Sequence, residues 1–110
     1  MYFRGTTPAF LLFIEEGPKI EQTDKVAVAL NTGEVEYFKD GESLTIDYDA
    51  NTVGVFLTEE ETWALNYKNK VTEIQVRVET QEGEVWMTPV ARVNLYDSLF
   101  ENYEGSHKSE

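Results

Sequence analysis

Strict alternation of polar and apolar side chains at residues 73–79, within the run VTEIQVRVET, most limits what this chain can fold into. Ile74, Val76 and Val78 point to one face of an extended backbone, and the charged or amide side chains between them point to the other face. A helix would scatter these apolar side chains around its axis. The run therefore predicts a β-strand with one buried face and one solvated face.

Shorter runs of the same kind precede this strand, and turn residues separate them. They occupy residues 23–31, 34–40, 43–48 and 51–57. Gly33 lies in the turn of the first predicted hairpin. A last run, residues 85–96, is interrupted by Pro89, which cannot donate a backbone hydrogen bond. We therefore expect Pro89 at a sheet edge, at a bulge, or where a strand changes sheets.

One segment, LTEEETWALNY, departs from the β period. Thr58 and Glu61 have the spacing of a capping box, and three glutamates stand where the helix dipole favours negative charge. We expect one short helix near residues 58–65. Together, the runs predict an all-β, mainly antiparallel fold: an immunoglobulin-like β-sandwich of about seven strands. The predicted sandwich domain covers residues 1–97, and residues 98–110 form a polar tail that we expect to be mobile.

Composition limits the chemistry and the partners of this chain. Its 110 residues include no cysteine and one histidine, and the formal net charge is −12. Such a charge repels phosphate backbones and anionic lipid, so we expect neither nucleic acid nor a membrane as partner. Without cysteine there are no thiol nucleophiles or thiolate metal sites, and the histidine, His107, falls in the expected tail. We therefore expect a non-enzymatic protein without a cofactor.

One turn carries a partial match to a calcium-binding loop. Asp47, Asp49 and Asn51 have the spacing of the first three ligand positions. Such a loop then needs glycine at its sixth position and glutamate at its twelfth, where this chain has Thr52 and Thr58. The double failure favours a hairpin turn and leaves a weak calcium site as the alternative. A calcium titration that does not shift the melting temperature would remove that alternative.

The N-terminus combines a compact RGTTP pentapeptide with the apolar run AFLLFI. The pentapeptide lacks the glycines and lysine of a phosphate-binding loop, and Pro8 favours an extended Thr7, so we interpret it as the lead-in to a strand. The run that follows is apolar on both faces, which is typical of a strand covered on both sides or of an interface strand. Tyr2 and Phe3 either pack under the sandwich or face a partner.

These segments resemble a family of small proteins encoded in phages and prophages of Gram-positive bacteria. The resemblance covers residues 3–96 and rests on RGTTP, DKVAVAL, NTVGVFLTEEET, TEIQVRV with its TQEGE turn, and the closing VARVNLY. It implies a structural protein of the virion, associated with the tail or baseplate and located in the virion or in the host cytoplasm during assembly. Its implied partners are phage structural proteins and further copies of itself. The acidity and the FENYEGSHKSE tail depart from the family pattern.

Two alternatives remain open: a carbohydrate-binding module for host cell-wall glycans, and an assembly factor that is absent from the virion. For the structural role, the apolar N-terminal strand and the strand broken at Pro89 are the candidate edges for a protein interface. Lysine in place of Leu11 should then abolish assembly and spare the fold. The predicted interface residues are Tyr2, Phe3, Arg4, Phe10, Leu11, Leu12 and Pro89.

Overall fold

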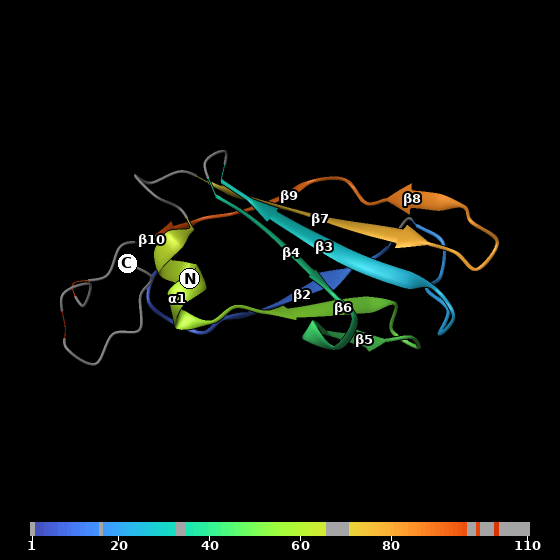
Figure 1. The fold of residues 1–110 in the computed structure, drawn as a ribbon, viewed down its shortest axis with the longest axis horizontal. Coiled ribbons are helices and arrows are strands. Elements are labelled where there is room, and N and C mark those ends of the chain that lie inside the picture. Colours follow the sequence, from blue (N-terminus) through green and yellow to red (C-terminus); the bar gives the residue numbers. More distant parts are fainter. Residues whose placement is uncertain are drawn as a thin grey trace.

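The computed structural model describes residues 2–15, 17–32, 35–65 and 71–96, together with Leu99 and Tyr103. Two β-sheets lie face to face in an elongated body of 48 × 23 × 22 Å, and a short helix covers one end (Figure 1). The predicted all-β, mainly antiparallel sandwich with one short helix is confirmed.

The smaller sheet contains three antiparallel strands. In spatial order they are β2 (Ala9–Phe13), β6 (Thr52–Phe56) and β5 (Leu44–Asp47). A 3-10 turn, η1 (Gly41–Ser43), leads into β5. Because β6 lies in the middle, β2 and β5 are the two edges of this sheet.

The larger sheet contains five antiparallel strands. They are β4 (Glu36–Asp40), β3 (Lys25–Asn31), β7 (Thr72–Glu79), β8 (Val85–Met87) and β9 (Ala91–Val93). The spatial order is β4-β3-β7-β8, and β9 pairs with another part of β7. Apart from the two sheets, β1 (Tyr2–Phe3) pairs in parallel with β10 (Leu95–Tyr96).

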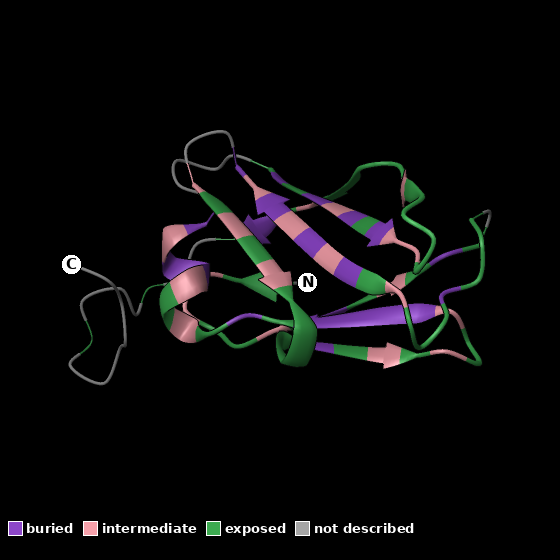
Figure 2. Ribbon diagram, turned by 45° about the vertical axis from the view of Figure 1, so that its right-hand side comes forward, coloured by how far each residue is buried: buried purple, intermediate pink, exposed green. Residues whose placement is uncertain are grey.

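The core lies between the sheets and follows the period of two. Buried and less buried positions alternate along β3 and β7 (Figure 2). Ile74, Val76 and Val78 are buried, as the alternation predicts. They face the buried residues of the smaller sheet, among which are Phe10, Val53 and Val55. Burial of these apolar side chains supplies most of the free energy that favours folding.

The described residues form ten strands where the sequence predicted about seven. The last apolar run divides at Pro89 into β8 and β9, and its end forms β10. Helix α1 (Glu59–Ala64) begins after Thr58 as its N-cap, inside the predicted range. Gly33 and most of the predicted tail, including His107, lie outside the described residues.

The RGTTP pentapeptide is fastened to helix α1. The backbone N–H of Gly5 donates to Oγ1 of the buried Thr62 at 3.0 Å, and that hydroxyl lies 2.8 Å from the carbonyl oxygen of Thr6. The Arg4 guanidinium donates to the carbonyl oxygen of Trp63 at 2.6 Å and lies 5.4 Å from the centroid of the Trp63 ring. The pentapeptide is therefore a structural clamp that joins the chain start to the segment after β6.

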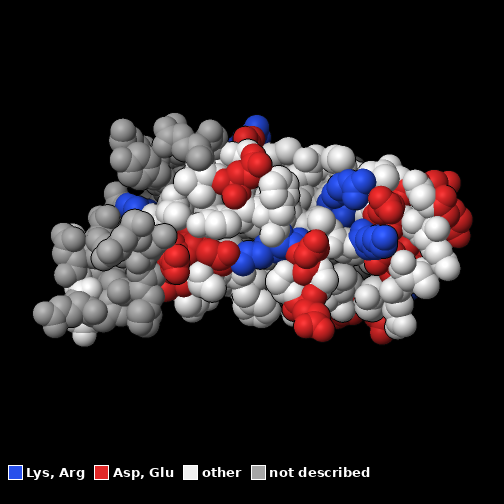
Figure 3. All heavy atoms as spheres, viewed as in Figure 1, with Lys and Arg blue, Asp and Glu red and all other residues white. Residues whose placement is uncertain are grey.

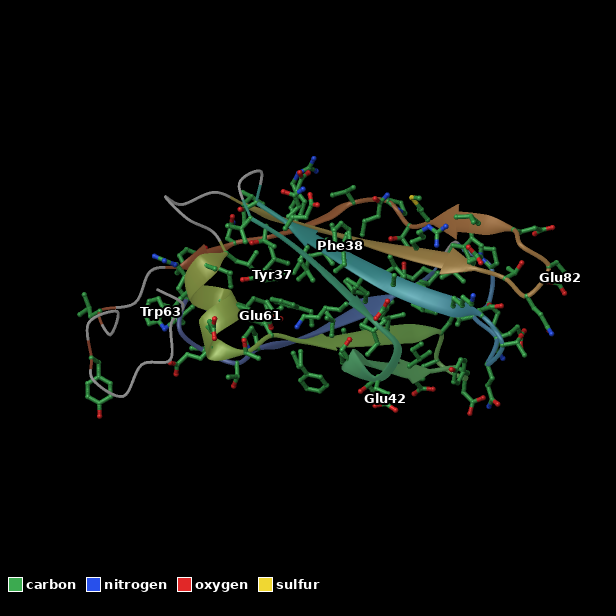
Figure 4. All side chains as sticks on the ribbon, in the orientation of Figure 1. Tyr37, Phe38, Glu42, Glu61, Trp63 and Glu82 are labelled. Carbon is green, nitrogen blue, oxygen red and sulfur yellow. The ribbon has the colours of Figure 1, made fainter. Side chains whose placement is uncertain are left out.

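A charged group also fixes the start of helix α1. Oε1 of Glu61 accepts from the backbone N–H of Thr58, and Oε2 accepts from Nζ of Lys39 on β4 at 2.6 Å. Figure 4 shows Glu61 on α1 and Tyr37 on the neighbouring strand β4. Partial burial raises the pKa of the Tyr37 hydroxyl, and the negative charges of Glu61 and Glu60 add to that rise.

Replacement of Gly5 by alanine is expected to destabilise the fold strongly. Gly5 has φ +81°, and a Cβ there would overlap the Trp63 ring, so the substitution would displace the ring from the clamp. Gly83 is the matched control, because it also has positive φ (+91°) but has open space around its Cβ position. In urea unfolding we expect a loss of about 1 kcal/mol for Gly83→Ala and at least twice that for Gly5→Ala. Equal losses would contradict the clamp.

Glutamine in place of Glu61 is expected to make stability less dependent on pH. Burial raises the pKa of Glu61, but the hydrogen bonds from Lys39 and Thr58 outweigh this effect, so the pKa of the folded state lies below its ordinary value. The charged carboxylate therefore stabilises the fold at neutral pH, and this contribution is lost as the pH falls through the folded-state pKa.

Because glutamine can still form a capping box, Glu61→Gln removes mainly the charge. We expect a loss of about 1 kcal/mol in the free energy of unfolding near neutral pH. The difference from the unsubstituted protein should shrink below about pH 4. A difference that stays constant into acid would show that the charge contributes nothing.

Candidate functional site

Strand β2 presents an unpaired side at one edge of the smaller sheet. Beyond its two ends, the Leu57 N–H donates to the Pro8 carbonyl and the Ile14 N–H donates to the Asn51 carbonyl. Hydrogen bonding alternates along an antiparallel ladder, so the backbone groups of Phe10 and Leu12 also face β6. Those of the residues between them point away, and no described residue pairs with that side.

The strand that carries Pro89 is the second predicted edge. Its two parts, β8 and β9, do form an edge of the larger sheet, and a β-bulge lies between them. Arg77 on β7 lies opposite Met87, but Ile74 lies opposite Ala91, so the strand carrying Pro89 has one extra residue between these pairs. Thr88 holds the bulge: its N–H donates to the Val76 carbonyl, and its Oγ1 accepts from the Val76 N–H. Of the three predicted arrangements for Pro89, the structure combines edge and bulge within one sheet.

These two edges border one apolar groove along an open side of the sandwich. Two adjoining hollows of about 330 and 310 Å³ share Phe13, Ile14, Thr88 and Pro89 in their walls. The first hollow is completed by Glu15, Gly17, Pro18, Trp86 and Met87. The second is completed by Leu11, Leu12, Ile74, Val76 and Ala91. We call this set the edge groove.

Large apolar side chains also cover the outer face of the smaller sheet. Leu11 is 64% exposed, Phe13 is 66% exposed and Phe56 on β6 is 56% exposed. Leu11 lies across Gly54, where an added Cβ would come within 3.3 Å of the Leu11 side chain. Exposed apolar side chains that gather on one sheet face and its edge are typical of a surface that binds a protein or another ligand.

The structure separates the predicted interface residues into surface and core. Leu11 and Pro89 are exposed at the edge groove, and Leu12 is half-buried beside them. Phe10 is buried in the core, so its side chain is not available to a partner of the folded monomer. Its interior position follows from the period of two, which an all-apolar run does not reveal.

The other N-terminal residues lie at the helical end of the molecule. Tyr2 and Phe3 are partly exposed: the Tyr2 ring packs edge-on against Phe10, and the Phe3 ring lies 6.2 Å from that of Tyr96. Arg4 belongs to the clamp described above. Each ring therefore contacts the domain and keeps an exposed part, and contact of that part with a partner stays a prediction.

The partial calcium motif forms a turn that fastens a loop. Asn51 has a left-handed backbone (φ 55°), its Oδ1 accepts from the Ile20 N–H, and its Nδ2 donates to the Ile14 carbonyl. Oδ1 of Asp47 accepts from the Ala50 N–H, and Asp49 is exposed. Within the described ranges, no three acidic or histidine side chains gather as metal ligands. Asn51 therefore fastens the backbones of Ile14 and Ile20 to this turn, a role that its motif did not suggest and that we call the latch.

Charge is mixed on the face shown in Figure 3. Acidic side chains lie toward both ends of the described surface, and basic side chains lie between and among them. On the described part of this face, basic groups are therefore interspersed with acidic ones and do not form a continuous stripe. Phe38, 70% exposed on β4, is the largest apolar exposure on the far edge of the larger sheet, while its neighbour Tyr37 packs on the core.

No family model, curated protein or solved structure matches this chain. The helices in the described part of the chain are too short to cross a membrane.

Substitutions at two successive residues of β2 are expected to differ sharply. Lysine at Leu11 points to solvent, so we expect the free energy of unfolding to change by less than about 1 kcal/mol. Alanine at the buried Phe10 leaves a cavity, and we expect a loss of about 3–5 kcal/mol. Chemical unfolding in dilute protein measures both values. A Leu11→Lys variant that unfolds would place Leu11 in the core and contradict the assigned face.

Proposed function

We propose that this protein is a non-enzymatic interaction protein whose edge groove and β2 edge bind protein partners in a phage particle. One observation supports this function most strongly: two sheet edges that are far apart in the sequence border one apolar groove. An unpaired strand edge supplies backbone hydrogen bonds to a partner segment, and the groove accepts its side chains. The tail or baseplate location rests on the sequence resemblance.

The clamp joins two of the sequence motifs on which that resemblance rests. RGTTP and LTEEET lie far apart in the sequence, yet Gly5 and Thr6 bond directly to Thr62, more than fifty residues away. The two motifs are therefore parts of one structural unit. A structural reason for their joint occurrence favours a shared fold over a chance match of short words.

Particle composition tests the proposed function. Quantitative mass spectrometry of purified particles from the source phage or induced prophage is expected to find the protein at a fixed copy number. Its absence from particles, despite expression during infection, would contradict a virion role and favour the assembly factor.

A pair of substitutions tests whether the edge groove makes the contact. Pro89→Asp places a charge in the walls of both hollows and is expected to exclude the protein from particles. Phe38→Asp is the control, because Phe38 is also exposed but lies on β4, away from the groove. Loss of incorporation in both variants, or in neither, would show that the groove is not the contact.

The outer face of the smaller sheet supports glycan binding as a second candidate function. The exposed rings of Phe13 and Phe56 lie on the same face as Thr45 and Asp47, whose side chains can accept or donate hydrogen bonds to sugar hydroxyls. A glycan array separates this alternative from protein binding. Binding that is lost in Phe56→Ala, with particle incorporation intact, would favour it.

A further inference from the structure

The four sheet edges differ in how they are protected against strand pairing. On β4, three of five residues are charged: Glu36, Lys39 and Asp40. Strand β5 has four residues and ends at Asp47, and the β8–β9 edge is interrupted by the bulge at Pro89. Charges, short length, proline and bulges are the devices that prevent edge-to-edge association. Strand β2, with the sequence AFLLF, contains none of them.

The unpaired backbone groups of β2 form a short regular array. Phe10 and Leu12 use their N–H and C=O groups toward β6, so those of Ala9, Leu11 and Phe13 point outward. An incoming antiparallel strand that engages all three must place one residue opposite each of them. For a copy of β2, this register pairs Ala9 of one strand with Phe13 of the other. In that register, Leu11 lies opposite the central residue of the incoming strand.

We propose that β2 pairs antiparallel with β2 of a second copy of this chain, on a two-fold axis that passes between the two Leu11 residues. The inference deepens the proposed function and rests on it, since it names a second copy as one occupant of the β2 edge. Pairing joins the two smaller sheets into one continuous sheet across the dimer.

Size complementarity favours a second copy as the occupant. Across the two-fold axis, the large Phe13 side chain lies beside the small Ala9 of the other copy, and Leu11 lies beside Leu11. Phe10 and Leu12 keep their inward direction, so Leu12 of each copy lies at the mouth of the other copy's edge groove. Leu11 and Phe13 of both copies lie on the same outer face of the joined sheet.

Charge does not oppose this contact locally, although the chain is acidic. The formal net charge is −12, yet residues 5–14 contain no charged side chain. Glu15, the first acidic residue after this run, lies opposite the uncharged Thr7 in the paired register. Repulsion between the two copies is therefore long-range, and salt screens it. Association is expected to strengthen as the salt concentration rises.

Sedimentation analysis of the purified protein tests the dimer itself. We expect a monomer–dimer equilibrium that shifts to dimer as protein or salt concentration rises, and a monomer at all concentrations for Leu11→Lys. Phe56→Ser is the control: it changes the exposed face but lies on the inner strand β6, and it should still dimerise. A wild-type protein that stays monomeric at its highest soluble concentration would overturn the proposal, and so would a dimer that Leu11→Lys leaves unchanged.

Single cysteines test the register, because the natural chain has none. Directly opposite residues in a hydrogen-bonded pair have Cα atoms about 5.5 Å apart, which suits a disulfide. Leu11→Cys should therefore form a disulfide-linked dimer under mild oxidation. Ala9→Cys alone and Phe13→Cys alone should not, since like residues are separated by about 13 Å along the strands, but a mixture of the two should cross-link.

Phe56→Cys is the control: it places a similarly exposed thiol away from the strand edge and measures how fast cross-links form by random collision. Ala9→Cys that cross-links with itself as fast as Leu11→Cys would overturn the register. These outcomes are separable from those for the proposed function. A monomer that still enters particles refutes self-pairing alone, and a dimer absent from particles refutes the virion role alone.

Discussion

The arrangement of the β2 edge and the edge groove depends on the hydrogen bonds of the Thr62 hydroxyl. It is buried, it accepts from the Gly5 N–H, and it lies within hydrogen-bond distance of the Thr6 and Glu59 carbonyls. It thereby joins the lead-in of β2 to the helix that follows β6, immediately beyond the ladder that these two strands form.

That position matters because a slip of one residue would turn every side chain of β2 to the opposite face. An all-apolar strand has little preference of its own between its two faces. With the clamp in place, Phe10 and Leu12 face the core, while Leu11 and Phe13 face solvent. The edge groove, the exposed face and the outward backbone groups of β2 all follow from this choice of register.

The sequence predicts the β-sandwich well where one face of a strand is exposed to solvent. The alternation around Ile74, Val76 and Val78 places all three correctly in the core. The capping box places helix α1 to within about one residue, because its signal is local. Pro89 limits its strand to an edge, a bulge or a change of sheet for an equally local reason, the missing N–H.

The candidate site is less accessible to sequence reasoning because its determinants are long-range. AFLLFI has no period, so nothing in it distinguishes the buried Phe10 from the exposed Leu11. The latch at Asn51 bonds to Ile14 and Ile20, more than thirty residues away, and its Asp-rich neighbours suggest a metal loop instead. Trp86 and Gly17 line the groove only because two sheets stack there.

Amide hydrogen exchange along β2, followed by NMR at low and high protein concentration, tests the assigned edge most directly. In dilute protein we expect protected N–H groups at Phe10 and Leu12 and fast exchange at Leu11 and Phe13. At high concentration, Leu11 and Phe13 should become protected as well. Uniform protection along the strand in dilute protein, or protection of Leu11 in place of Leu12, would contradict both the register and the open edge.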